Sequence, residues 1–420
     1  MNNFFKIKLK SGALQFAIYT GAIIALLLLG LILYLYTFKM LRQNSEIIID
    51  NIKAANIGFI NATKKNDILN DTTIISNFDD QNQKVKTVSS FWGIFQKTLV
   101  LAENKNKVFY KCGLIGSNLS ENKRLSLYLK NNYKPLIVVG NTKIEGNVMI
   151  PKQGVQSGYI AGNSYLGDQL IYGNLKISSQ DLPKLNRSLI NELDTYEKDY
   201  MSTLSSYILS GNTKNINSFL SGTYIIYKEN SFSVNEEIIG NYIIKSDNTI
   251  IITKSSQLRD VIVMASEIII EDGVVGNFQA IATNKIYVGR NVSLSYPSAL
   301  VINENKDVLI KEAQIVIDEF SSLKGIILFR TKKDLSNSFE THLKISENTK
   351  ILGDIYCEGN FELRGEVWGS VYTHQLISNT AGTIFINHLY NAKISNKGFP
   401  NYYSGILLEN ERKNTMKWLY

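Results

Sequence analysis

The most informative stretch of this sequence reads Asn348-Thr349-Lys350-Ile351-Leu352-Gly353-Asp354-Ile355. It nearly repeats an earlier stretch, Asn141-Thr142-Lys143-Ile144-Glu145-Gly146-Asn147-Val148. The shared kernel is an aliphatic residue, any residue, a glycine, any residue and an apolar residue. This kernel returns at Ile171/Gly173/Leu175, Val274/Gly276/Phe278 and Val367/Gly369/Val371. Internal repeats of this kind indicate a body built from similar structural units.

The spacing of the repeats predicts a coil of short strands. Ile351 and Val367 are 16 residues apart, and Ile268-Ile269-Ile270 matches Ile286-Tyr287-Val288 18 residues later. Glycine and asparagine suit the corners of such a coil because they tolerate positive φ. The sequence therefore predicts a mainly β protein with a parallel β-helix-like solenoid. A β-sandwich is the alternative, since its short strands have similar turn signals. The rung pattern around residues 351–371 also resembles that of bactofilins, which are bacterial polymer-forming β-helix proteins.

The composition limits the number and kind of domains. The chain has 420 residues and resembles an average globular protein, with 44% apolar and 20% charged residues. The predicted organisation comprises a basic leader (1–12), a transmembrane and stalk helix (13–65), a β-rich linker domain (66–135) and the solenoid body (136–420). One inserted helix is predicted at about 187–210, from apolar residues spaced by three or four. Its apolar positions are Leu189, Leu193, Tyr196, Tyr200, Leu204 and Ile208.

One segment is apolar enough to cross a membrane. No charged residue occurs from Ser11 to Phe38, and a helix of this length exceeds the ~30 Å thickness of the hydrocarbon core. Lys6, Lys8 and Lys10 precede it, which favours a cytoplasmic N-terminus by the positive-inside rule. A single-pass protein of the bacterial inner membrane is predicted, with the body periplasmic or extracellular.

The residues before the apolar run carry a family resemblance. Lys6-Ile7-Lys8-Leu9-Lys10-Ser11-Gly12, followed at once by Ala13, resembles the leader of type IV pilins and type II secretion pseudopilins. The resemblance implies that a prepilin peptidase cuts between Gly12 and Ala13. The family usually has Glu at the fifth mature position, which is Ala17 here. A plain uncleaved signal anchor is the alternative.

Two helical faces follow from the spacing of the residues. Ala13, Ala17, Gly21 and Ala25 recur every fourth residue, and small residues at this spacing let membrane helices approach closely. Beyond the apolar run, an amphipathic stripe predicts that the helix continues outside the membrane as a stalk. Its residues are Leu41, Ile48, Ile52, Ala55 and Phe59. The alternative is a break into two helices with a stop at Gly58.

The sequence predicts no catalytic residue, metal site or cofactor. Nucleophile, phosphate-loop and zinc motifs do not occur, and the three histidines lack metal-ligand spacing. Carboxylates near the second repeat are predicted to be solvated surface groups: Asp354, Glu358, Glu362 and Glu366. The two cysteines, Cys112 and Cys357, are either paired or buried and free. The net charge of +8 is dispersed, so a nucleic-acid partner is not predicted.

The predicted function is structural: a non-enzymatic, minor pilin-like component of a pilus or secretion-type filament. Its partners would be the lipid bilayer and other membrane helices or pilin-like subunits. One alternative is a signal-anchored β-helix that binds or cleaves envelope polysaccharide. A second alternative is a cytoplasmic, bactofilin-like scaffold.

Overall fold

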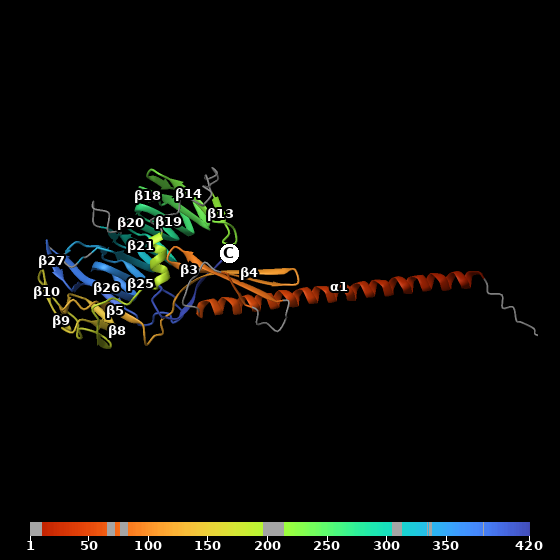
Figure 1. Ribbon diagram of the computed structural model, residues 1–420, viewed down its shortest axis with the longest axis horizontal. Helices are drawn as coiled ribbons and strands as arrows, with labels where there is room; N and C mark the ends of the chain where they lie inside the picture. The colour runs from red at the N-terminus through yellow and green to blue at the C-terminus, as the bar shows by residue number, and fades with distance from the viewer. Residues whose placement is uncertain are drawn as a thin grey trace, which may run out of the picture.

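The protein consists of one long helix and a large β body. The computed structural model describes residues 11–64, 72–75, 83–195, 214–304, 313–333, 335, 338–380 and 382–420. The first helix, α1 (Ser11–Lys64), projects far from the rest of the chain (Figure 1). Within the described residues the remainder is mainly β, as predicted. Residues 1–10 of the predicted leader lie outside the described part.

Helix α1 is continuous over 54 residues. This confirms the predicted long helix at 13–65, which contains no proline to interrupt it. The alternative of two helices with a stop at Gly58 is wrong, because Gly58 lies inside α1. The helix from Gly12 has a mean hydropathy of 2.6 in its most apolar window and is long enough to cross a membrane.

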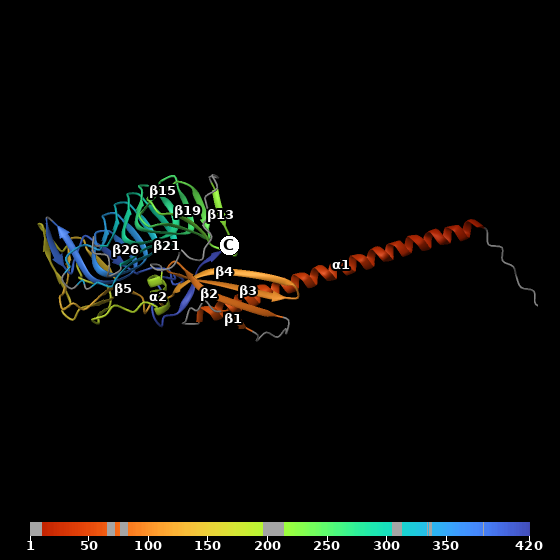
Figure 2. The ribbon, with the colours of Figure 1, turned by 45° about the horizontal axis from the view of Figure 1, so that its top comes forward.

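A small antiparallel sheet packs against the last third of α1 (Figure 2). Its strands, in spatial order, are β1 (Thr72–Ile75), β2 (Lys84–Trp92), β3 (Phe95–Asn104), β4 (Lys107–Ser117) and β30 (Lys413–Leu419). The core between helix and sheet is formed by Ala54, Ala55, Phe59, Ala62, Val85, Val100, Ala102 and Ile115. We call this unit the helix–sheet module.

The strands of the body pair in parallel and stack in three columns. The first column holds β13 (Lys214–Asn217), β16 (Glu237–Gly240), β29 (Lys393–Ser395) and β7 (Lys143–Glu145). The second holds β14 (Tyr224–Lys228), β17 (Tyr242–Ser246), β5 (Leu125–Leu129), β8 (Asn147–Ile150) and β12 (Leu175–Ile177). The third holds β15 (Phe232–Val234), β18 (Thr249–Ile252), β22 (Gln314–Ile317), β24 (Leu343–Ile345), β28 (His388–Tyr390), β6 (Leu136–Val139) and β9 (Val155–Ser157).

Six longer strands run through two or three of these columns and connect them. They are β19 (Gln257–Ile270), β20 (Val275–Val288), β21 (Ser293–Glu304), β23 (Ser322–Thr331), β25 (Lys350–Leu363) and β26 (Glu366–Thr380). Aliphatic side chains from all three columns fill the interior. Antiparallel pairing, which a β-sandwich requires, occurs among the described body strands only at β10 (Tyr159–Ile160) with β11 (Asn163–Ser164) and at β26 with β27 (Thr383–Ile386).

The parallel-stacked strands of the body, called the coil below, follow one another in space in an order that differs from the chain order. The first turns, which contain β5 to β12, form the end of the body that lies far from α1 (Figure 1). The chain then passes to the opposite end, at β13, and winds back until β29 lies beside β7. As a result, four residues lie opposite one another in successive neighbouring strands: Ile351, Val367, Ile394 and Ile144. The two copies of the sequence repeat therefore occupy equivalent positions.

Glycines turn the chain at one corner of the coil. Gly325, Gly353 and Gly369 are stacked by the strand register and have φ of 150°, 148° and 145°. A Cβ at Gly353 would lie 1.8 Å from the carbonyl oxygen of Gly325. The repeated glycine is thus required both by its backbone conformation and by the closeness of the neighbouring turn.

The inserted helix is confirmed only in its first part. Helix α2 comprises Arg187–Thr195, and residues 196–210 of the predicted helix lie outside the described residues. Asn186 caps it, since its Oδ1 accepts hydrogen bonds from the backbone N–H groups of Ser188 and Leu189. The buried side chains of Leu189 and Leu193 belong to the apolar cluster outside the coil.

The predicted limits of the body, residues 136 and 420, both differ from the observed ones. Strand β5 belongs to the body, where it pairs with β26 and β8. Strand β30 belongs instead to the helix–sheet module, where it pairs with β4. Short strand segments carry little information about partners distant in the sequence, so the boundary could not be located from local patterns.

Candidate assembly site on the N-terminal helix

The predicted cleavage position lies in the first turn of α1. Gly12 and Ala13 are helical and exposed. The lysines of the predicted leader, Lys6, Lys8 and Lys10, lie outside the described residues. Cleavage between Gly12 and Ala13 therefore remains a prediction.

The predicted small-residue face lies on a continuous, exposed part of α1. Ala13, Ala17, Gly21 and Ala25 are all exposed, and a Cβ at Gly21 would meet no atom of the chain within 4 Å. Large apolar side chains around this face, from Leu14 to Phe38, are also exposed to more than half. None of the most apolar window of α1 is buried against the described part of the chain.

The predicted amphipathic stripe is right in its last part only. Ala55 and Phe59 are buried, but Leu41, Ile48 and Ile52 are 64%, 45% and 37% exposed. The face that packs on the sheet is made mainly of small residues: Asn51, Ala54, Ala55, Gly58, Phe59 and Ala62. Small side chains allow the helix backbone to lie close to the sheet, and a search for large apolar residues misses them.

A buried polar contact fixes the position of α1 along the sheet. The Asn51 side chain is 1% exposed and donates a hydrogen bond to the Lys107 carbonyl at 2.9 Å. Gln83 donates to Asn51 Oδ1 at 3.0 Å and to the Glu103 carbonyl at 3.3 Å. Because buried polar groups are costly when unpaired, these bonds disfavour other positions of the helix. No sequence pattern marked Asn51 or Gln83 as important.

The last strand contacts α1 directly. The rings of Phe59 and Trp418 lie 4.6 Å apart between centroids. Lys111 Nζ lies 3.8 Å from the centre of the Trp418 ring and contacts Asn56 of the helix. Burial lowers the pKa of Lys111. The final residues of the chain therefore help to hold the helix.

The hairpin between β2 and β3 connects the module to the body. Gln279 of β20 accepts a hydrogen bond from the Ile94 backbone N–H at 2.9 Å and donates one to the Trp92 carbonyl at 2.8 Å. Gly93, at the tip of the hairpin, has φ of +63° and lies against the Gln279 side chain. The Gln279 side chain is 3% exposed, so these bonds lie inside the contact between the two parts.

Two of the four carboxylates predicted to be solvated are buried. Asp354 is 4% exposed and its Oδ2 accepts a hydrogen bond from the Ile406 N–H at 3.1 Å. Burial raises the pKa of Asp354 to about 6, although Arg124 nearby opposes the shift. Glu362 is 3% exposed and pairs with Arg364 at 3.2 Å. The prediction is wrong for these two because Asp354 lies against Gly405 and Ile406, and Glu362 lies against β26, where it accepts a hydrogen bond from the Asn379 N–H at 3.3 Å.

The two cysteines are free and buried. Cys112 lies in β4 of the module, and Cys357 lies in β25 of the body. Burial raises the pKa of Cys112 to about 11 and that of Cys357 to about 12. Of the two alternatives left open by the sequence, the unpaired one is confirmed. Among the described residues, no group of three or more His, Cys, Asp or Glu side chains is placed to hold a metal ion.

His342 makes the stability of the body sensitive to acid. Its side chain is 1% exposed, its Nδ1 accepts a hydrogen bond from the Asn360 N–H at 3.0 Å, and burial lowers its pKa to about 4. Between pH 6.5 and pH 4, His342 is protonated in the unfolded chain but remains neutral in the folded chain. We therefore expect His342 to cost roughly 3 kcal/mol of stability as the pH falls from 6.5 to 4.

Urea unfolding of the full chain in detergent at several pH values checks this prediction. The reference is His342→Asn, whose side-chain oxygen can still accept the bond from Asn360. The difference in stability between the two chains isolates His342, because all other titratable groups are common to both. A difference that does not change between pH 7 and pH 4 contradicts the prediction.

Comparison with known proteins places the chain in no family. No protein-family model matches it, and no curated protein matches it in sequence. Among solved structures it is weakly similar to the competence-associated pilin ComZ from Thermus thermophilus. The two are 10% identical, with a TM-score of 0.19, and the likeness covers 84% of this chain and 87% of ComZ. At this TM-score the likeness by itself supports no assignment.

Proposed function

We propose that this protein is a membrane-anchored, pilin-like structural subunit of a pilus or secretion-type filament. The observation that carries the proposal is the helix–sheet module. A single helix of 54 residues has an exposed apolar first half, while its last third packs on a small antiparallel sheet. Such a helix can reside in the bilayer before assembly and pack against other helices afterwards.

The body is proposed to be an elaboration of this module. It is inserted between β4 and β30, which are neighbours in the small sheet although residues 118–412 lie between them. The three columns of parallel strands support assignment of the body to the parallel β-helix class. A large body on one subunit leaves little space for a subunit stacked above it, which favours a position at the tip of a filament.

The exposed stalk supports a role in contacts between helices. Beyond the apolar run, aliphatic side chains of α1 remain exposed: Leu41, Ile48, Ile49, Ile52, Ile57 and Ile60. In water, isolated apolar side chains are common, but six on one projecting helix indicate a surface that is covered in an assembly. The proposed location is the bacterial inner membrane, with the N-terminus cytoplasmic and the body outside the cytoplasm.

N-terminal sequencing of the full chain purified from membranes tests the proposal. The pilin-like leader implies a mature terminus at Ala13, and Gly12→Leu should block the cut and leave the leader attached. Ser11→Ala is the matched control, since it changes the neighbouring residue and should leave the cut in place. An intact N-terminus at Met1 in the wild-type chain would refute a pilin-like subunit and favour a plain anchor or a cytoplasmic scaffold.

A further inference from the structure

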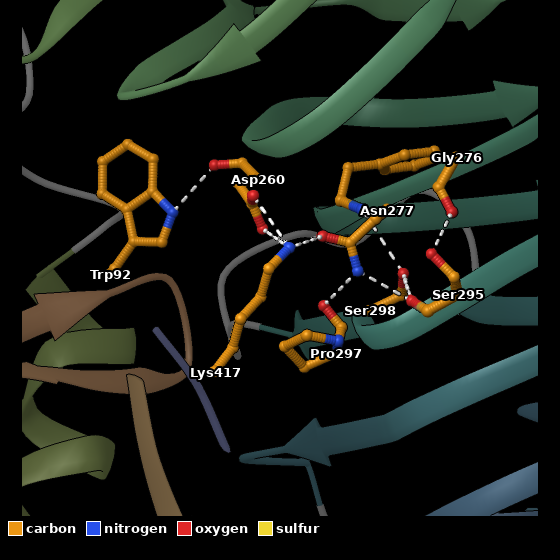
Figure 3. A network of polar contacts seen from close by, with 9 residues as sticks. Trp92, Asp260, Gly276, Asn277, Ser295, Pro297, Ser298 and Lys417 are labelled. Atoms are coloured by element: carbon orange, nitrogen blue, oxygen red, sulfur yellow. Dashed lines mark hydrogen bonds and ion pairs between the residues drawn. The ribbon is translucent and has the colours of Figure 1, made fainter. Parts of the chain in front are cut away.

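The last strand carries a lysine that reaches across to the body. Lys417 lies in β30 of the helix–sheet module, and its Nζ contacts two side chains of the body (Figure 3). It lies 2.6 and 2.8 Å from the two carboxylate oxygens of Asp260 and 3.3 Å from Oδ1 of Asn277. An amine, a carboxylate and a carboxamide thus meet at one point.

The carboxamide is held in a single orientation. Nδ2 of Asn277 donates hydrogen bonds to the backbone carbonyls of Ser295 at 2.8 Å and Pro297 at 3.0 Å. With its nitrogen fixed on that side, Asn277 presents its carbonyl group to Lys417 (Figure 3). Asn277 is 5% exposed, so bulk water has little access to its amide carbon.

The carboxylate is also fixed in place. Asp260 has a φ of +59°, at an irregularity in the pairing of β19 with β20. Its backbone carbonyl accepts a hydrogen bond from Trp92 Nε1 at 3.2 Å. Its side chain is 14% exposed. A residue other than glycine rarely adopts positive φ, and such strain occurs often at functional sites.

We propose that Lys417 and Asn277 form an intramolecular isopeptide bond, with Asp260 as the catalytic acid–base residue. Asp260 takes a proton from the Lys417 ammonium, and the neutral amine attacks Cγ of Asn277. The Nζ–Cγ bond forms, the Cγ–Nδ2 bond breaks, and Asp260 returns its proton to the departing nitrogen. Nδ2 leaves as ammonia, one proton stays on Nζ as the amide hydrogen, and the remaining proton passes to solvent. No oxidant or cofactor is needed.

Lys417 comes from the helix–sheet module, whereas Asp260 and Asn277 come from neighbouring strands of the body. The contact therefore requires that β30 is paired in the sheet and that the sheet lies against the body. A bond there would join the C-terminal strand covalently to β20. The inference is independent of the proposed function, because it rests on these contacts alone.

Mass spectrometry of the full wild-type chain, denatured after purification in detergent, tests the inference. We expect a mass lower by one ammonia than that calculated from the N-terminus found by sequencing, and a branched peptide after trypsin digestion that joins Lys417 to Asn277. Lys417→Arg and Asp260→Asn should each restore the full mass. Lys413→Arg makes the same kind of change four residues earlier in β30 and should keep the loss of ammonia.

Two results would overturn the inference. One is a wild-type chain at full mass that yields only linear peptides. The other is the loss of one water with a peptide joining Lys417 to Asp260, which would exclude Asn277 as the acceptor. The wild-type measurement decides alone, so the inference stays testable even where a variant does not fold.

Discussion

Replacing Gly353 by alanine is expected to destabilise the body by about 3 kcal/mol or more. The new Cβ would lie 1.8 Å from the Gly325 carbonyl oxygen, at a φ of +148° that side chains rarely adopt. Neither β23 nor β25 can move away without losing its parallel pairing on the other side. The midpoint of urea unfolding, followed by near-UV circular dichroism of the full chain, measures the effect.

Gly222→Ala is the matched control for this variant. A Cβ at Gly222 would meet no atom within 4 Å, and its φ lies outside the positive range. We expect a change within about 0.5 kcal/mol. Equal unfolding midpoints for the two variants would show that the glycine corner does not support the coil as described.

Replacing Gly58 by leucine is expected to separate α1 from the sheet, at a cost of about 3 kcal/mol. A Cβ at Gly58 would lie 2.8 Å from Val85 Cγ1 and 2.9 Å from Val100 Cγ1, and leucine adds three further carbon atoms. The sheet cannot yield to them, since Val85 and Val100 are fully buried beneath the helix. The contact between Phe59 and Trp418 should then be lost.

Two measurements report on this separation. Limited proteolysis should begin to cut α1 between residues 39 and 64, and tryptophan fluorescence should shift to the red as Trp418 becomes more exposed. Ile57→Leu is the matched control, because Ile57 is the adjacent residue and is 47% exposed. If Gly58→Leu keeps the protease resistance and emission of the wild-type chain, the described packing of α1 is wrong.

The elements that the sequence predicted well are those with a local cause. The long helix follows from an uninterrupted apolar run without proline. The repeated glycine follows from a backbone corner that recurs in each turn, and the structure places Ile144 and Ile351 in one column. The β content predicted for residues 66–135 is likewise found, since β2, β3 and β4 lie there.

The features that the sequence did not reveal depend on contacts between distant segments. Nothing near Lys413 indicates that this segment pairs with β4, and nothing near Leu125 indicates a place in the coil. A helix end at Gly58 was one alternative from the sequence. A glycine can either terminate a helix or allow another element to pack closely against it. Only the valines opposite it show which use applies. The role of the small-residue face of α1 in helix packing stays a prediction, and the buried Asn51 was not predicted at all.

The pairing of β30 with β4 has a consequence for biosynthesis. The sheet that supports α1 lacks β30 until the chain has been made beyond the whole body, because Lys413–Leu419 follow the body in the sequence. A product truncated anywhere in the body would keep the complete apolar helix but would lack Trp418 and the edge strand beside β4. The sheet is thus completed only in chains that contain the segment after the body, and chains truncated within the body should be cut more readily by proteases near α1.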